Sequence, residues 1–182
     1  MARKETVTKK MIQDNAFLML QEEGIEAVTA RKLATRIGCS TQPIFRLYEN
    51  MSQLNNELFE MSMNYFEEYC SKCTGNHEQP FINLGLSYIQ FASEEPNLFK
   101  ILFLSKERMG KQLYELLNGK TEAVRKELMK AAQSGCKDPG QMFMKMWNFI
   151  HGAACMTITG DYDLNAEETA ALLNDTYRAL NQ

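Results

Sequence analysis

The segment Val28–Leu54 constrains the fold most, because it predicts two short helices joined by a tight turn. Thr29 is a good N-cap for the first helix, since its hydroxyl can accept a hydrogen bond from a backbone N–H two or three residues on. Gly38 can end that helix in a left-handed conformation. Ser40 or Thr41 can cap the second helix. Two helices joined by a short glycine-containing turn form the helix-turn-helix arrangement, whose second helix can enter the major groove of DNA.

This segment resembles the DNA-binding domain of TetR-family transcriptional regulators, and the resemblance covers about the first third of the chain. The family pattern is a helix that ends in glycine, a small polar turn, an apolar–aromatic pair, a second aromatic residue and a closing leucine. The matching residues are Leu33, Ala34, Ile37, Gly38, Cys39, Ser40, Thr41, Ile44, Phe45, Tyr48 and Leu54. The family usually has Tyr at positions 45 and 47 and Lys at position 51, where this chain has Phe45, Leu47 and Met51. Three expected phosphate contacts are therefore missing.

If the second helix enters the major groove, its N-terminal half faces the base edges. Gln42 could then bond adenine bidentately, and Arg46 could reach a guanine or a phosphate. Thr29, Arg31 and Tyr48 would contact phosphates, and Ser40 could add to these contacts. Thr41 could offer a base its hydroxyl or its methyl group, and Pro43 could touch a thymine methyl group. The predicted DNA contacts are Thr29, Arg31, Ser40, Thr41, Gln42, Pro43, Arg46 and Tyr48. Helix capping is the alternative role for Ser40 and Thr41, and Phe45 is expected in the core because it offers a phosphate no hydroxyl.

Basic residues are concentrated in the same part of the chain. Residues 1–54 hold eight Lys and Arg against six acidic residues, a net charge of +2. The remaining residues hold twelve against seventeen, a net charge of −5. This asymmetry is what nucleic-acid binding requires, although a merely solvated surface can also produce it.

Helical periodicity runs through most of the chain, so the predicted fold is all-α with about nine helices. A three-helix DNA-binding domain is expected over residues 1–51, and a regulatory and dimerisation bundle over residues 52–182. Besides the two helices of the helix-turn-helix, helices are predicted at about 6–23, 52–73, 80–93, 97–104, 121–134, 139–159 and 166–180, with another helical turn or two over 111–117. Ser52 and Asp138 are the expected N-caps of two of them, and Asn165 with Glu168 predicts a capping box for the last.

A second motif, Trp147 to Gly152, resembles the signature of one class of TetR-family C-terminal domains, named for its Trp, His and Gly. A glycine inside a helix costs roughly 1 kcal/mol relative to alanine, and Gly152 would be tolerated where a partner helix packs closely. The resemblance implies a small ligand bound within the C-terminal helices. The candidate pocket residues are Phe103, Trp147, His151 and Cys155. Alternatively, His151 is a histidine of the core, and the methionines around the motif only fill the core.

Composition argues against several other classes of protein. The chain lacks an apolar run of roughly 18 residues that could span a membrane, and its first ten residues lack the apolar core of a secretory signal. Five scattered cysteines favour reduced thiols in a cytoplasmic protein. Cys70, Cys73 and His77 suggest a zinc site, but a fourth ligand is not evident. His151 and Cys155 could hold a metal ion, but two ligands alone are little evidence for a site. We therefore expect no metal and no cofactor.

Together these features favour a ligand-responsive transcriptional regulator, a repressor that binds a pseudo-palindromic operator as a homodimer. The helices at about 139–159 and 166–180 would pair with their twofold mates, and a small-molecule effector would release the DNA. We expect no catalysis, because a phosphate loop, a metalloprotease motif and a nucleophile elbow are all absent. Two alternatives remain: an all-α enzyme or ligand carrier whose N-terminal hairpin is only structural, and a dimeric DNA-binding protein that senses no small molecule.

Overall fold

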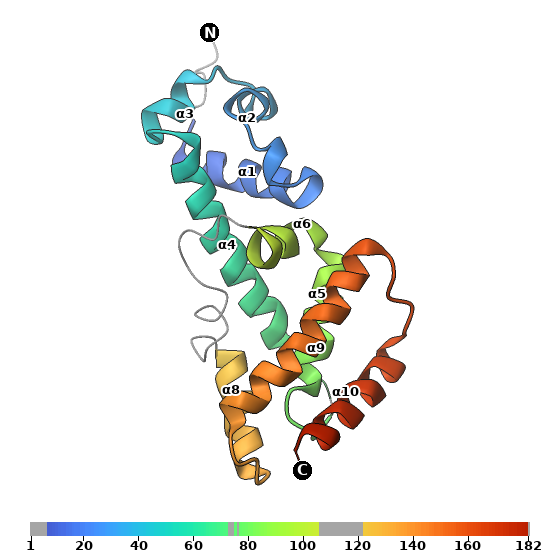
Figure 1. The fold of residues 1–182 in the computed structure, drawn as a ribbon. Coiled ribbons are helices and arrows are strands. Elements are labelled where there is room, and N and C mark those ends of the chain that lie inside the picture. Colours follow the sequence, from blue (N-terminus) through green and yellow to red (C-terminus); the bar gives the residue numbers. More distant parts are fainter. Residues whose placement is uncertain (1–6, 73–74, 76, 106–121, 182) are drawn as a thin grey trace. The chain divides into compact units, whose positions relative to one another are not determined.

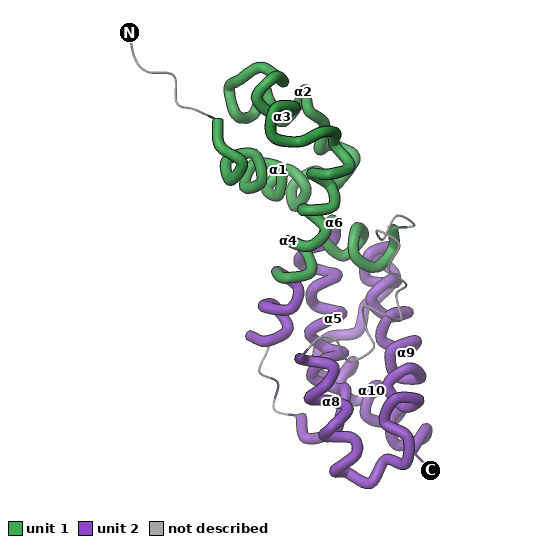
Figure 2. Tube along the Cα trace, turned by 90° about the vertical axis from the view of Figure 1, so that its left-hand side faces the viewer, with its two compact units in different colours: residues 1–64, 97–109 green, residues 65–96, 110–182 purple. Residues whose placement is uncertain are grey.

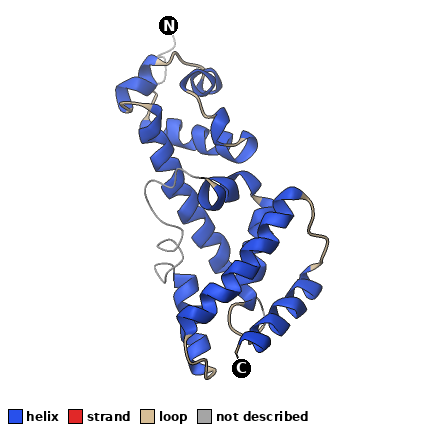
Figure 3. Ribbon diagram, in the orientation of Figure 1, coloured by secondary structure: helices blue, strands red, loops and turns tan. Residues whose placement is uncertain are grey.

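The computed structural model describes residues 7–72, 75, 77–105 and 122–181 (Figure 1). All regular elements in these residues are helical, as predicted, and nine of them are α-helices (Figure 3). In chain order the elements are α1 (Lys9–Glu23), the 3₁₀ turn η1 (Ile25–Ala27), α2 (Ala30–Ile37), α3 (Gln42–Leu47), α4 (Met51–Lys72), α5 (Ile82–Glu94), α6 (Pro96–Phe99), the π-helical turn η2 (Lys100–Leu104), α8 (Glu122–Gln133), α9 (Pro139–Thr159) and α10 (Ala166–Leu180). The predicted helix over 111–117 lies outside the described residues. None of the helices described is long and apolar enough to cross a bilayer.

The chain divides into two compact units (Figure 2). The first comprises residues 1–64 and 97–109, and the second comprises residues 65–96 and 110–182. Helix α4 contributes residues to both units, and the segment 97–104 belongs to the first although it follows α5. Neither unit is therefore a single stretch of sequence. The functional boundary after residue 51 stays a prediction.

In the first unit, α1 buries the apolar stripe that its periodicity predicts. Its members Ile12, Ala16, Met19 and Leu20 are all almost fully excluded from solvent. The helix begins at Lys9 rather than at residue 6, because the Thr8 hydroxyl accepts a hydrogen bond from the Met11 amide (3.2 Å) and so caps it.

Helix α4 begins at Met51, one residue before the predicted cap at Ser52. The capping residue is Asn50, whose side-chain oxygen accepts from the Gln53 amide (3.0 Å). The Gln53 side chain in turn accepts from the Glu49 amide (2.9 Å). The bond to Asn50 satisfies an amide that the first turn leaves unpaired, so Ser52 lies within the helix and the predicted cap is wrong.

In the second unit, α5 packs against α9, and both contact α8 and α10. Gly85 in α5 allows this close packing, since a Cβ atom there would lie 2.9 Å from the terminal methyl groups of Ile150 in α9 and Leu173 in α10. The predicted caps of the last two helices are confirmed. Asp138 accepts from the Gln141 amide (2.9 Å), and Asn165 forms a complete capping box with its partner three residues on.

Candidate nucleic-acid interface

The helix-turn-helix in the first unit has the predicted local geometry. The Thr29 hydroxyl accepts from the Lys32 amide (3.3 Å) and caps α2. Gly38 ends α2 in the left-handed region (φ 77°, ψ 33°), where a residue with a Cβ atom is strained. The next amide, that of Cys39, donates back to the Ala34 carbonyl (2.9 Å) and closes the helix end. The four residues 38–41 therefore lead directly from α2 into α3.

Helix α3 begins without the side-chain cap that the sequence predicts. Thr41 is its N-cap residue, but the Thr41 hydroxyl makes no capping hydrogen bond in the described structure. Its carbonyl instead accepts from the amides of Ile44 (3.1 Å) and Phe45 (3.2 Å). Both candidate caps, Ser40 and Thr41, are exposed, so their hydroxyls are available to a partner.

The predicted DNA contacts differ in their exposure. Six of the eight are exposed: Thr29, Arg31, Ser40, Thr41, Gln42 and Arg46. Pro43 is half-buried, and Tyr48 is buried with 1% of its surface exposed. The N-terminal half of α3 thus presents polar side chains to solvent while Ile44 holds the helix to the core.

Tyr48 belongs to a partly buried polar cluster rather than to the exposed surface. Its hydroxyl donates to a carboxylate oxygen of Glu57 in α4 (2.8 Å). The same carboxylate accepts from Gln13 (2.8 Å) and from Lys9 (2.5 Å), both in α1. A hydroxyl held in this way is not presented to a phosphate, so the predicted contact of Tyr48 does not fit the structure. The cluster instead ties the end of α3 to α1 and α4.

The electrostatics of this cluster follow from burial and hydrogen bonding. Partial burial opposes ionisation of Glu57, but the hydrogen bonds from Lys9, Tyr48 and Gln13 outweigh it, and the pKa of Glu57 is lowered. Burial, and then the bond to the charged carboxylate, raise the pKa of the Tyr48 hydroxyl. Glu57 is therefore ionised and Tyr48 neutral at physiological pH.

Phe45 corrects another prediction. It was expected in the core because it has no hydroxyl, yet 50% of its surface is exposed. Leu47 is also exposed. Between Gln42 and Tyr48, only Ile44 and Tyr48 are buried. A helix of six residues has room for only one narrow row of side chains that face the core.

The basic residues of α2 and α3 fall into two classes. Lys32 and Arg36 form ion pairs with the α1 carboxylates Glu23 (3.1 Å) and Glu22 (2.6 Å). Arg31 and Arg46 are exposed and form no ion pair with any described residue. These two guanidinium groups are therefore the cations that are available to an anionic partner.

No protein-family model and no curated protein matches the sequence. Solved structures do match over nearly the whole chain. A protein of unknown function from Rhodococcus sp. RHA1 is 17% identical with a TM-score of 0.75, and all of both chains are covered. A candidate TetR-family transcriptional regulator from a Rhodococcus species is 12% identical with a TM-score of 0.66, over 95% of this chain and 98% of that one. Another, from Vibrio parahaemolyticus, is 15% identical with a TM-score of 0.61, over 94% and 97%.

The chain has the fold of TetR-family regulators.

Within this TetR-like fold, three of the four predicted ligand residues come together in the second unit. The Trp147 ring stacks on His151, with centroids 4.5 Å apart. The Tyr88 hydroxyl lies 3.0 Å from Nδ1 of His151, and the Cys155 sulfur lies 3.5 Å from its Nε2. Burial raises the pKa of the Cys155 thiol. Phe103, the fourth, is buried in the first unit.

Trp147 is the unusual member of this group. Only 8% of its surface is exposed, and its indole N–H has no acceptor among the described residues. Buried donors are normally satisfied, so an unpaired one is a place where an acceptor atom from elsewhere could bind. The sequence predicts the residue but not its unsatisfied donor, because whether a buried N–H meets an acceptor depends on the tertiary packing.

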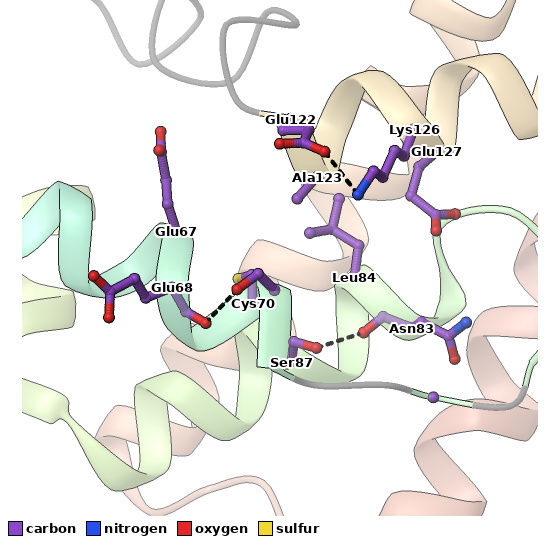
Figure 4. A pocket seen from close by; sticks show the side chains of 12 residues that line it. Glu67, Glu68, Cys70, Asn83, Leu84, Ser87, Glu122, Ala123, Lys126 and Glu127 are labelled. Carbon is purple, nitrogen blue, oxygen red and sulfur yellow. Dashed lines mark hydrogen bonds and ion pairs between the residues drawn. The ribbon is translucent and has the colours of Figure 1, made fainter.

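The second unit also contains a cavity that the sequence does not predict. It lies between α4, α5 and α8 (Figure 4). Its volume is about 580 Å³, and none of the four predicted ligand residues lines it. Its charged lining consists of Glu67, Glu68, Glu122, Lys126 and Glu127, of which Lys126 pairs with Glu122 (2.8 Å). The lining is therefore acidic.

The suggested metal sites gain no support. Cys73, one member of the proposed zinc set, lies outside the described residues. Among the residues that are described, no three His, Cys, Asp or Glu side chains come together in a way that could hold a metal ion. The cysteines that the structure describes, Cys39, Cys70, Cys136 and Cys155, form no disulfide with one another.

Proposed function

We propose that this protein is a DNA-binding transcriptional regulator, acting in the cytoplasm as a homodimeric repressor on a pseudo-palindromic operator, and released by a small molecule. The observation that carries the proposal is the exposed α3. It follows a left-handed turn at Gly38 and presents Thr41, Gln42 and Arg46 to solvent. A helix placed in this way can enter a major groove. The fold shared with two candidate TetR-family regulators supports the same conclusion.

We assign roles to the exposed residues by their chemistry. Gln42 would read a base, because its amide can bond adenine bidentately. Arg31, with no ion pair in the described structure, would bind a phosphate and position the domain. Arg46 would reach a guanine or a phosphate. Because the Thr29 hydroxyl already caps α2, that residue would contribute at most a weak phosphate contact.

The proposed dimer contact is the outer face of α9 and α10. Large apolar side chains are exposed there, and they line a shallow groove of about 510 Å³. They are Phe149, Met156, Leu164 and Leu172. Clustered apolar side chains on a surface favour a protein partner. A twofold pairing would give the homodimer two α3 helices, which an operator with half-sites in successive major grooves, roughly 34–36 Å apart, requires.

Gly152 lies in the middle of this face and supports the same contact. A Cβ atom there would meet nothing within 4 Å. The protomer itself therefore gives no packing reason for a glycine inside α9, where it costs roughly 1 kcal/mol relative to alanine. The close approach of a helix from a second copy would supply such a reason.

The proposed effector site centres on Trp147, His151 and Cys155. A ligand with an acceptor oxygen or nitrogen could pair with the unsatisfied indole N–H of Trp147. Binding would stabilise one arrangement of the second unit. Its effect on DNA affinity can be no larger than the ligand's differential affinity for the DNA-bound and released states.

Fluorescence anisotropy with labelled duplexes tests the proposed function. The full chain is first used to select duplexes from a random pool, and the best are titrated from 50 to 300 mM salt. We expect saturable binding whose affinity falls steeply with salt, because phosphate contacts release counterions. Failure to bind any duplex at 50 mM salt would overturn the proposal and favour the ligand-carrier alternative. A broad compound screen by thermal shift tests the effector separately, and a silent screen would favour a regulator that senses no small molecule.

A further inference from the structure

We infer that Phe45 reads a thymine C5-methyl group, so that each operator half-site carries a thymine whose methyl group faces α3. This inference rests on the proposed function and specifies the base pair that the same surface recognises. It starts from the exposure of half of the Phe45 surface, next to the exposed polar residues Gln42 and Arg46 of the same helix.

The position of Phe45 on α3 comes first. Residues three and four apart share a face of a helix, so Phe45 lies over the turn that carries Thr41 and Gln42. Both of these are exposed and belong to the proposed base-reading face. Leu47, also exposed, is two residues further on and faces another side of the helix. Phe45 is therefore the large apolar group on the face that would meet the bases.

The chemistry of the ring limits what it can contact. Phe45 has no donor or acceptor and so cannot bind a phosphate or a polar base edge. In the major groove the one apolar feature of a base edge is the C5-methyl group of thymine. Contact with that methyl would remove exposed ring surface from water, which is favourable. Gln42, one turn earlier, has the chemistry to read adenine, so the two residues together favour A·T pairs.

The test replaces thymine by deoxyuridine, one position at a time, in a duplex selected by the full chain. Uracil keeps the pairing and the O4 acceptor of thymine and lacks only the methyl group. At one position in each half-site we expect the Kd to rise about fourfold, the value for one methyl group removed from an apolar contact. The same replacement should have no effect on the Phe45→Ala variant, for which thymine and uracil duplexes should bind alike.

Two further variants control the result. Leu18→Ala removes an exposed apolar side chain from α1 in the same unit and should leave the thymine preference intact. Phe45→Leu keeps an apolar group and should retain part of the preference, and circular dichroism checks that each variant folds. Equal affinity of the parent for thymine and uracil duplexes at every position would overturn the inference while leaving the proposed function standing. A thymine preference that persists in Phe45→Ala would overturn it too, because another residue would then read the methyl. Absence of any DNA binding would remove the proposed function and this inference together.

Discussion

The exposed apolar groups of α3 and of the α9–α10 face are chemically alike, but their surroundings differ. Phe45 on α3 stands among Gln42 and Arg46, which can bond base edges or phosphates. Phe149 on α9 lines a groove whose other members include Asp161 and Asp163, which would repel a phosphate backbone. An exposed aromatic ring alone therefore does not identify a partner. The charge around it favours DNA at one surface and a second copy of the chain at the other.

The largest effect should come from breaking the α9–α10 face. We expect Phe149→Lys to abolish the dimer and to weaken operator binding at least about 100-fold, because a single α3 loses the avidity of two linked half-sites. Sedimentation equilibrium measures the dimer, and fluorescence anisotropy measures the affinity for DNA. Phe149 is 37% exposed, so the protomer itself should stay folded.

Met129→Lys is the matched control, since Met129 is 58% exposed on α8 and lies outside the proposed contact.

Gly152→Ala tests the same α9–α10 face. It should raise the helical stability of the protomer, because the new methyl group meets nothing, and yet weaken the dimer if a partner helix crosses there. A dimer that is unchanged in both Phe149→Lys and Gly152→Ala would show that the contact lies elsewhere.

A smaller effect should separate positioning from reading on the DNA-binding surface. Arg31→Ala should weaken binding to every duplex by a similar factor of about 10 and lower the salt dependence by about one ion. Gln42→Ala should relax the preference at a single operator position, by about 1–3 kcal/mol. Anisotropy against a panel of single-base operator variants measures both effects.

Arg36→Ala is the control for this pair, because Arg36 lies on the same helix as Arg31 but is held by Glu22. It should change DNA affinity little. If Arg31→Ala and Gln42→Ala both bind like the parent, α3 is not the recognition helix.

The smallest effect concerns the cluster that holds α3 in place. The pKa of Glu57 is lower in the folded protein than its ordinary value of 4.5. Its contribution to stability is therefore fully present above the unfolded value and is lost as the pH falls through the folded value. We expect the free energy of unfolding, measured by urea titration, to fall between about pH 5 and pH 3, and to fall less steeply in Glu57→Gln.

Glu122→Gln provides the matched control, since the pKa of Glu122 is also lowered but its side chain is exposed on α8. An exposed ion pair contributes little, so this variant should follow the parent. Identical pH profiles for the parent and Glu57→Gln would mean that the cluster does not stabilise the folded first unit.

Most of the fold could be predicted from the sequence because helix ends depend on neighbouring residues. The cap at Thr29, the left-handed Gly38 and the capping box at Asn165 each involve atoms within a few residues. The prediction failed where two good caps compete locally, as Asn50 and Ser52 do at the start of α4. Sequence spacing alone does not decide between them.

The sequence by itself determined the helix-turn-helix and the limits of the last two helices, since these follow from short-range hydrogen bonds and periodicity. Only the tertiary structure decided which aromatic residue near the end of α3 is buried and which is exposed. Tyr48 is buried because its hydroxyl has a partner in another helix, the carboxylate of Glu57 in α4. That carboxylate also accepts from Gln13 and Lys9 in α1. Phe45 has no such partners and stays in solvent. That choice depends on residues as far as 48 positions apart in sequence, which no local pattern encodes.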